Sequence, residues 1–311
     1  MLTGASSFTG VWFAEALAAD GWEVVAPLLR HRDAYSGIRA DRVERLSRVA
    51  KVEFNCGFGT PAMLELIAAG GPIHVFGHHA AKIDGYRHPD FDFIAAVQEN
   101  IHNGGQVFAA LKRASCRGVL LTGTVFEAGE GGADLPAVTS YGLSKSLTRT
   151  VLEAWADEVG LDFGAFIIPS PYGIGEEPRF PWYLFRTWFD GRAAVVRTPY
   201  VVRDHIAVPQ LAKAYSQSAQ RILSGEAHRF VVRPSGWIAT QSDFAKRLAA
   251  QARDRLMLSC PLELLDQTIS DEPYCRVNSD AVGPFEDEDE FWDKYIAWYA
   301  ELQAAGRLQL A

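Results

Sequence analysis

Apolar positions along the chain alternate between short continuous runs and longer stretches with helical spacing. The short runs predict buried strands, and the stretches that recur every three or four residues predict helices. The predicted strands cover residues 23–29, 52–55, 73–76, 118–121 and 162–168. The predicted helices cover residues 11–19, 91–113, 141–159 and a stretch after Pro61. This alternation indicates an α/β fold with a doubly wound parallel sheet and right-handed crossovers.

The pattern changes near Pro169, where a turn-rich stretch over residues 169–175 is followed by aromatic clusters. The end of the chain contains an amphipathic helix around residues 291–299. We therefore expect two parts. Residues 1–168 form the sheet domain, and residues 169–311 form a smaller mixed lobe that closes a cleft and returns some elements to the sheet.

Composition narrows the classes of protein that fit. The chain of 311 residues has a formal net charge of −8, which argues against nucleic acid as a partner. No apolar run is long enough to span a membrane. Four cysteines without close pairing, and no secretory segment, predict reduced thiols and a cytoplasmic location.

A glycine-rich turn, Thr3-Gly4-Ala5-Ser6-Ser7-Phe8-Thr9-Gly10, precedes the first predicted helix. A strand normally leads into such a turn, so the strand here is very short or the start is truncated. Glycines allow close backbone approach, and a helix N-terminus offers free N–H groups and positive potential to a pyrophosphate. An ordinary strand-to-helix turn would show the same pattern.

Tyr141 and Lys145 lie four residues apart on a predicted helix, so both side chains share one face. A nearby cation lowers the pKa of a phenol, which is otherwise about 10. Such a tyrosine can exchange a proton with an oxygen on a carbon that exchanges hydride. The spacing is common by chance, so the interpretation depends on its context.

That context comes from the ends of the predicted strands. In doubly wound sheets, ligands bind beyond the carboxyl ends of the strands. The residues at or just after these ends are Gly4, Gly10, Ala80, Ala81, Thr122 and Pro169. We therefore expect one composite site at this edge of the sheet.

In order and spacing, these segments resemble the extended short-chain dehydrogenase/reductase family, also called the NAD-dependent epimerase/dehydratase family, from Thr3 to about Ala214. Ser7 stands at the central glycine of a TGxxGxxG fingerprint. Four other segments are similar to family motifs. His78-His79-Ala80-Ala81 resembles H-x-A-A, and Leu121-Thr122-Gly123-Thr124-Val125-Phe126 resembles S/T-S-x-x-V-Y. Pro169-Ser170-Pro171-Tyr172-Gly173-Ile174-Gly175 resembles P-x-x-Y-G-P-G, and Arg203-Asp204-His205-Ile206-Ala207-Val208 resembles R-D-F-I-x-V.

The resemblance implies a Rossmann-like dinucleotide-binding domain and a role for each matching residue. Tyr141 is implied as general acid/base, Lys145 as the group that tunes Tyr141 and holds the nicotinamide ribose, and Thr122 as a hydrogen-bond donor to the reacting oxygen. The other implied cofactor-binding residues are Gly4, Ser6, Ser7, Phe8, Thr9, Gly10, His79, Ala80, Ala81, Asn100 and Pro169. The implied substrate contacts are Thr124 and Arg203, the latter with a diphosphate.

Blander interpretations remain for several of these residues. Without the family resemblance, Thr122 would be interpreted as a strand-end residue whose side chain bonds to backbone. Arg203 would be interpreted as a surface residue in an ion pair. No carboxylate completes a metal-binding set with His78 and His79, so we expect packing or cofactor contacts there and no metal site.

The cofactor preference depends on the end of the second strand, where an acidic residue would bond the adenosine 2′-hydroxyl of NAD. No acidic residue occurs there before Asp33, and Arg30 and Arg32 could face a 2′-phosphate. We therefore predict NADP, with NAD as the alternative. Both arginines could also be solvated loop residues.

The resemblance also limits the reaction. The family's 4,6-dehydratases carry Asp-Glu after the catalytic threonine, whereas this chain has Gly123-Thr124, which argues against dehydration. We expect a reductase of a 4-keto sugar nucleotide. The alternatives are a nucleotide-sugar 4-epimerase with tightly bound NAD, a reductase of a non-nucleotide carbonyl compound, and a non-catalytic dinucleotide sensor. Family members commonly dimerise through the two helices predicted at residues 91–113 and 141–159, which implies a homodimer.

Overall fold

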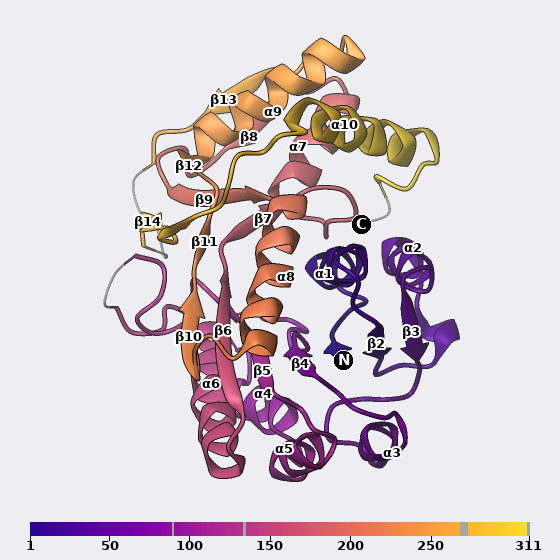
Figure 1. Ribbon diagram of the computed structural model, residues 1–311. Helices are drawn as coiled ribbons and strands as arrows, with labels where there is room; N and C mark the ends of the chain where they lie inside the picture. The colour runs from indigo at the N-terminus through magenta and orange to yellow at the C-terminus, as the bar shows by residue number, and fades with distance from the viewer. Residues whose placement is uncertain (89, 133–134, 268–272, 310–311) are drawn as a thin grey trace.

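Parallel strands form the centre of the computed structural model, which describes residues 1–88, 90–132, 135–267 and 273–309 (Figure 1). The five-stranded sheet has the order β1-β4-β5-β6-β10. Its strands are β1 (Leu2–Thr3), β4 (Val75–His78), β5 (Gly118–Thr124), β6 (Asp162–Ile168) and β10 (Arg229–Val232). Next to β1, β2 (Val24–Pro27) pairs in parallel with β3 (Ala50–Glu53). The predicted doubly wound α/β fold is confirmed.

The strand order reverses direction at β1, so the crevice that binds ligands in such sheets lies beyond the carboxyl ends of β1 and β4. The first strand has only two residues, which pair with Gly77 and His78 of β4. The preceding Met1 extends this pairing, because its carbonyl accepts a hydrogen bond from the Gly77 amide. A strand this short places the glycine-rich turn directly beside the end of β4.

Helices cover both faces of the sheet. On one face, α1 (Phe8–Ala19) packs against α8 (Val208–Ser224), where the rings of Phe13 and Tyr215 stack with centroids 4.0 Å apart. On the other face lie α4, α5 and α6 (Figure 1). Around the first three strands lie α2 (Gly37–Leu46), α3 (Pro61–Ala69) and a short 3₁₀ helix (Arg32–Ala34). Both α8 and β10 come from beyond residue 168, so the chain returns to the sheet, while the proposed boundary itself stays a prediction.

The continuous helix predicted over residues 91–113 is wrong. The structure has α4 (Phe93–Asn100) and α5 (Gly104–Arg113), separated at Asn103, which adopts a left-handed φ of 49°. A β-carbon on Gly104 would collide with the ring of Trp155 on α6. The turn at residues 101–103 therefore lets α5 pack closely against α6, a tertiary contact that the apolar spacing does not reveal.

The helix that carries Tyr141 and Lys145 is α6 (Ser140–Val159), and its bounds agree with the prediction. Thr139 caps its start by accepting a hydrogen bond from the Gly142 amide at 3.0 Å. Gly160 ends it with a left-handed φ of 68°. The cap fixes where the first turn begins and therefore where Tyr141 lies.

The C-terminal lobe is built on short strands and three helices. One mixed sheet contains β7, β9, β12 and β14, and two strand pairs join β8 to β13 and β11 to β15. These strands are β7 (Ser170–Tyr172), β8 (Ala194–Val196), β9 (Val202–Ala207), β11 (Pro234–Ser235), β12 (Trp237–Thr240), β13 (Leu262–Leu264), β14 (Cys275–Arg276) and β15 (Asp280–Ala281). The helices are α7 (Phe180–Phe189), α9 (Gln241–Leu256) and α10 (Glu288–Ala304).

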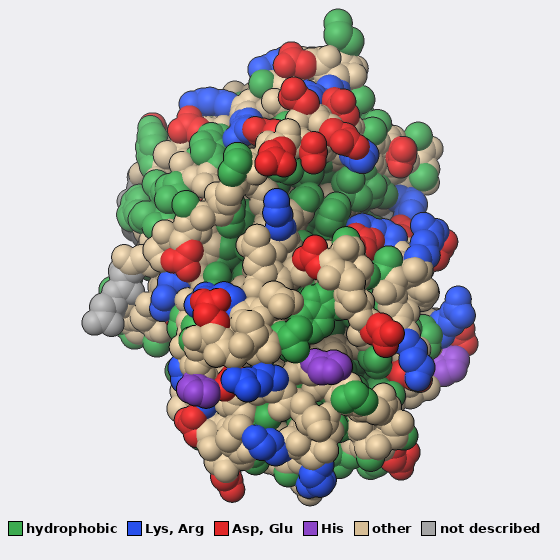
Figure 2. Space-filling view, viewed as in Figure 1, with side chains coloured by type: hydrophobic (Ala, Val, Ile, Leu, Met, Phe, Trp, Pro, Cys, Tyr) green, Lys and Arg blue, Asp and Glu red, His purple; other side chains and the backbone are tan. Residues whose placement is uncertain are grey.

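The surface of the molecule reflects its net negative charge. On the face shown in Figure 2, acidic side chains gather over the end that carries α9 and α10, whereas Lys and Arg are dispersed. Within the described part of the chain, no helix is both long and apolar enough to cross a membrane. Cys56, Cys116, Cys260 and Cys275 are free thiols. The cytoplasmic location stays a prediction.

A buried carboxyl group joins the lobe to the turn after β7. Glu176 is 1% exposed and accepts hydrogen bonds from the hydroxyls of Tyr295 and Tyr299 on α10. Burial raises the pKa of Glu176 to about 7, and the two tyrosine hydroxyls only partly offset this effect. Glu176 therefore keeps its proton in the folded protein at pH values where an unfolded chain has released it.

This cluster predicts a pH-dependent stability. Because the folded protein holds the proton and the unfolded chain does not, the free energy of unfolding should fall as pH rises from about 4.5 to about 7. The contribution of Glu176 is roughly 1.4 kcal/mol per pH unit in that window. Urea unfolding at a series of pH values should show this slope in wild type and its loss in Glu176→Gln. The neighbouring variant Glu177→Gln should retain it; an unchanged slope in Glu176→Gln would contradict the assignment.

Candidate active site

The glycine-rich turn is packed directly against the end of β4. Gly4 has a φ of 68°, and a β-carbon there would lie 2.7 Å from the Ala80 amide nitrogen. A β-carbon on Gly10 would collide with the Gly4 carbonyl oxygen. At the position of the central fingerprint glycine, Ser7 caps α1, because its Oγ accepts a hydrogen bond from the Gly10 amide at 3.1 Å. The turn therefore needs glycine at positions 4 and 10 and accommodates serine at 7.

The N-terminus of α1 has the features that a diphosphate requires. No described residue accepts a hydrogen bond from the amides of Phe8 or Thr9, the first two residues of the helix. Two free N–H groups at the positive end of a helix dipole form an anion site. The predicted residues Gly4, Ser6, Ser7, Phe8, Thr9 and Gly10 all lie in or beside this turn. The turn thus fits the diphosphate of a dinucleotide.

His79 connects this turn to β4. Its Nε2 lies 2.9 Å from Ser7 Oγ and 3.0 Å from Thr9 Oγ1, and the tautomer of the ring sets which partner donates in these hydrogen bonds. Burial, together with the Lys145 cation, lowers the pKa of His79 to about 3. The imidazole is therefore neutral at physiological pH. Thr3 Oγ1 accepts from the amides of His79 and Ala80, each at 3.1 Å.

His78 lies beside His79 and contacts the same turn. His78 Nδ1 bonds Thr3 Oγ1 at 3.0 Å, and burial followed by Lys145 lowers the pKa of His78 to about 3. Among residues 1–88, 90–132, 135–267 and 273–309, no group of three or more His, Cys, Asp or Glu side chains is arranged to hold a metal ion. The contacts made by His78 and His79 are packing contacts around the turn.

Lys145 fixes α6 to the end of β5. The side chain is buried, and Nζ donates a hydrogen bond to the Thr122 carbonyl at 2.7 Å. One turn before it, the Tyr141 ring is half-buried between Tyr86 and Phe91, with ring centroids 5.0 and 6.5 Å away. Tyr141 and Lys145 are thus on the side of α6 that faces the strand ends.

Asn100 holds the loop after β4 in place beside α6. Its Oδ1 accepts from the Lys82 amide at 2.7 Å, and its Nδ2 donates to Thr148 Oγ1 at 3.3 Å. Ala80 and Ala81 lie in this loop, between His79 and Lys82. Asn100, Ala80 and Ala81 therefore lie together at the strand ends, and the buried Pro169 follows the end of β6.

The expectation that Lys145 lowers the pKa of Tyr141 is wrong in this structure. The pKa of Tyr141 lies well above its ordinary value because burial disfavours the phenolate and the Glu127 carboxylate adds to the effect. The pKa of Lys145 lies below its ordinary value because of burial, which Glu127 partly offsets. The ammonium is bonded to a carbonyl of β5, so its charge is directed to the strand end.

Thr122 contributes its backbone to this arrangement, while its side chain points to the other face of the sheet. Thr122 pairs in register with Phe166, which belongs to the core on the α1 and α8 face. Its hydroxyl faces the Tyr215 hydroxyl on α8. Thr122 Oγ1 forms no hydrogen bond of good geometry with a described residue. The structure therefore brings the Thr122 carbonyl, and not its hydroxyl, to Lys145.

The arginines predicted to contact ligands lie in different parts of the structure. Arg30 and Arg32 are exposed after the end of β2. Arg203 lies in β9, where its guanidinium donates to the carbonyls of Val202 and Pro273 at 2.9 and 3.2 Å. Thr124, the other predicted substrate contact, is buried at the last position of β5.

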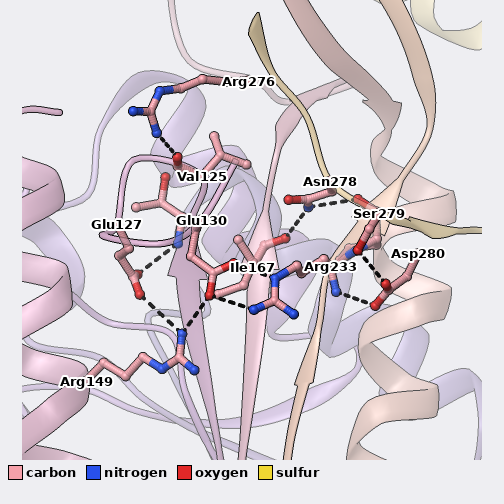
Figure 3. A network of polar contacts seen from close by, with 12 residues as sticks. Val125, Glu127, Glu130, Arg149, Ile167, Arg233, Arg276, Asn278, Ser279 and Asp280 are labelled. Carbon is pink, nitrogen blue, oxygen red and sulfur yellow. Dashed lines mark hydrogen bonds and ion pairs between the residues drawn. The ribbon is translucent and has the colours of Figure 1, made fainter. Parts of the chain in front are cut away.

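Three charged residues near the site escaped the sequence analysis. Glu127 follows β5, and the Arg179 cation acts on the pKa of Tyr141 from the start of α7. Arg276 is buried, pairs with Arg203 across β14 and β9, and donates to the Val125 carbonyl (Figure 3). None of the three residues occupies a position of the motifs described above, so no motif could have pointed to them.

Comparison with known proteins identifies the family. A family model described as the NAD dependent epimerase/dehydratase family matches residues 1–232. The chain belongs to this family. It is an enzyme of the extended short-chain dehydrogenase/reductase type, as the sequence motifs predicted. A comparison with curated proteins found no match.

Solved structures of the NAD-dependent epimerase/dehydratase type share the fold. UDP-glucuronic acid 4-epimerase from Bacillus cereus, in complex with UDP-glucuronic acid and NAD, has a TM-score of 0.72 and 16% identity over 97% of this chain and 98% of that chain. UDP-glucose 4-epimerase from Thermotoga maritima has a TM-score of 0.71 and 17% identity over 97% and 98%. A dTDP-glucose 4,6-dehydratase from Streptomyces venezuelae with NAD bound has 0.68 and 16% over 98% and 97%.

The packing of the turn against β4 predicts a strong effect of Gly4→Ala. The new β-carbon meets backbone atoms of residues 79 and 80 at a positive φ, so the free energy of unfolding should fall by about 2 kcal/mol or more. Gly21→Ala has a similar φ of 86° but open space, and should cost about 1 kcal/mol. Urea unfolding measures both losses, and fluorescence titration with NADPH should show weakened binding only in Gly4→Ala. Equal losses in the two variants would contradict the close packing.

Proposed function

We propose that this enzyme is an NADP-dependent reductase of a 4-keto sugar nucleotide. Family membership, the anion-binding turn and the Tyr141–Lys145 pair support a hydride-transfer reaction. Several structural neighbours were solved with nucleotide sugars, which supports that substrate class. The direction of the reaction and the cofactor are argued from residues of this chain.

The observation that carries the reductase assignment is the pair of exposed arginines beyond β2, Arg30 and Arg32, which suits a 2′-phosphate and so favours NADP. A reductase consumes NADPH as its hydride donor, and the Tyr141 phenol can donate a proton to the carbonyl oxygen as its carbon gains hydride. Burial and the nearby Glu127 charge both raise the pKa of Tyr141, which favours the protonated phenol.

A nicotinamide dinucleotide, when bound, supplies the hydride for this reaction. The free amides of Phe8 and Thr9 would hold its diphosphate, and Gly4 and Gly10 would allow the close approach. Lys145, on α6 beside the end of β5, would hold the nicotinamide ribose. Tyr86 and Phe91, in the segment after β4, pack against the Tyr141 ring and would help to orient it. Arg203, with Arg276 beside it, would bind the substrate diphosphate.

Arg30 and Arg32 support NADP over NAD. Both are exposed beyond β2, and neither forms an ion pair with another described residue. The one acidic side chain of this segment, Asp33, is 3.2 Å from His31 in an exposed pair. Two guanidinium groups without a competing carboxylate suit a 2′-phosphate better than a 2′-hydroxyl.

A nucleotide-sugar 4-epimerase is the second candidate. Several structural neighbours are nucleotide-sugar 4-epimerases, some solved with NAD. An epimerase oxidises and re-reduces one carbon with the same cofactor. The purified protein should therefore retain bound nicotinamide dinucleotide, which adds to its ultraviolet absorbance. A reductase should be empty and consume added NADPH with a 4-keto sugar nucleotide. A sensor would bind the dinucleotide without turnover.

We also propose a homodimer through α4, α5 and α6. Leu143 and Leu147 on α6 are 36% and 39% exposed, and Ile94 on α4 is 52% exposed. Apolar side chains exposed on neighbouring helices favour burial against a second copy. Sedimentation equilibrium of the free protein measures the state directly.

The cofactor assignment predicts the effect of Arg30→Ala with Arg32→Ala. Loss of two charge-assisted contacts should weaken NADPH binding by about 100-fold and NADH binding by less than about threefold. Cofactor fluorescence titrations measure both affinities. Arg48→Ala, at an exposed ion pair with Glu44, serves as the control and should change neither. Equal effects on NADH and NADPH would rule out a 2′-phosphate contact.

The general-acid role predicts the effect of Tyr141→Phe. Removing the hydroxyl should lower kcat by about 100-fold or more while cofactor affinity stays within about tenfold, because only proton transfer is lost. Steady-state kinetics with NADPH and a 4-keto sugar nucleotide, alongside cofactor titration, separate the two effects. Tyr200→Phe, an exposed tyrosine, should behave as wild type. Full activity in Tyr141→Phe would remove Tyr141 from the mechanism.

A further inference from the structure

We propose that Glu127 is a positioning residue of the active site, with its carboxylate in the space that a side chain at position 123 would fill, beside Tyr141 and Lys145. The proposal rests in part on the proposed function, because it assigns Lys145 to the cofactor. Glu127 lies outside the family motifs quoted above.

A tight turn after β5 fixes Glu127. The Glu127 amide donates to the Thr124 carbonyl at 3.0 Å, and Glu127 Oε1 accepts from the Thr124 amide at 2.9 Å. The side chain is 2% exposed. These two bonds turn the carboxylate back along β5, toward the strand end, and away from solvent.

Gly123 makes the room for this carboxylate. Residues 119 and 121 of β5 point into the core under α5 and α6, and strand alternation places position 123 on the same face. A β-carbon on Gly123 would lie 2.8 Å from Glu127 Oε1 and 3.2 Å from Oε2. The neighbour on β6 is the apolar Ile167. Any side chain at 123 would therefore displace the carboxylate.

The charged and titratable groups that face Glu127 come from α6 and from its own loop. They are Tyr141, Lys145 and Arg149 on α6, and Glu130 in the loop. The carboxylate opposes the lowering of the Lys145 pKa by burial and adds to the raised pKa of Tyr141. Burial raises the pKa of Glu127 itself, and Lys145 and Arg149 oppose this effect. When ionised, the carboxylate favours the proton on both members of the pair.

The neighbouring Glu130 shows what a purely structural carboxylate looks like here (Figure 3). Glu130 Oε1 accepts from Arg149 at 3.0 Å, and Oε2 accepts from Arg233 at 2.6 Å, so both oxygens are bonded to guanidinium groups. Glu127 Oε2 forms no hydrogen bond with a residue that the structure describes and lies 3.8 Å from Arg149 Nη1. Both Glu127 oxygens lie next to position 123 at the end of β5, whereas Glu130 fastens the loop to α6 and to the residue after β10.

The first test is a stability cycle on the free protein, which needs no cofactor. Glu127→Gln and Lys145→Met are compared singly and together by thermal unfolding. If the charges are coupled, the Tm loss of the double variant should fall short of the sum of the single losses by about 4 °C. The matched cycle of Glu130→Gln with Lys145→Met should be additive. If Glu127→Gln does not fold, Gly123→Ala takes its place, because its β-carbon displaces the carboxylate.

The second test is the pH dependence of NADPH affinity from fluorescence titration. Affinity should fall at high pH as Lys145 loses its proton, and in Glu127→Gln this fall should begin about one pH unit lower. Glu127→Asp should restore most of the wild-type profile, and Glu130→Gln should match wild type. Additive losses in the first cycle, or an unmoved profile in Glu127→Gln, overturn the proposal. Failure of the wild-type protein to bind any nicotinamide dinucleotide instead overturns the proposed function, and the stability cycle still decides the charge coupling.

Discussion

The hydrogen bond from the Lys145 ammonium to the Thr122 carbonyl is the constraint on which the rest of the site depends. It joins a buried charge on α6 to a backbone carbonyl near the end of β5. The bond therefore fixes the distance between the helix and the sheet at the end where the site lies. A buried ammonium without such a partner would cost several kcal/mol. Tyr141 follows because it lies one helical turn earlier on the same face. The cap at Thr139 and the close packing of Gly104 on Trp155 keep α6 in this register.

A second constraint is steric and acts at the other side of the crevice. Because β1 has two residues, the glycine-rich turn has almost no strand to support it, and the end of β4 provides that support instead. Thr3 accepts from two amides after β4, and His79 forms hydrogen bonds with the hydroxyls of Ser7 and Thr9. Ser7 therefore replaces a glycine without loss of the turn, since its hydroxyl serves as helix cap and as a partner of His79.

Local patterns were enough to predict the sheet, its doubly wound order and the position of α6, because buried strands and amphipathic helices have different periods. They were not enough to place the break at Asn103, which depends on the approach of α5 to Trp155 of another helix. Motif spacing pointed to the turn, Tyr141, Lys145 and Asn100, whose roles stay predictions. It did not give the electrostatics: the raised pKa of Tyr141 depends on burial and on Glu127, which only the folded chain brings near. The orientation of the Thr122 hydroxyl toward Tyr215 likewise depends on which face of the sheet the even-numbered residues of β5 occupy.

The pairing of a bare Gly123 with an inward-turned Glu127 has a consequence for how such enzymes diversify. The acidic residue that 4,6-dehydratases carry directly after their threonine would, in this chain, meet the carboxylate of residue 127 within contact distance. Two anions that close cannot both stay ionised in a buried site. A change from one chemistry to the other would therefore need substitutions at positions 123 and 127 together. An acidic residue introduced at position 123 alone should not produce a working dehydratase site.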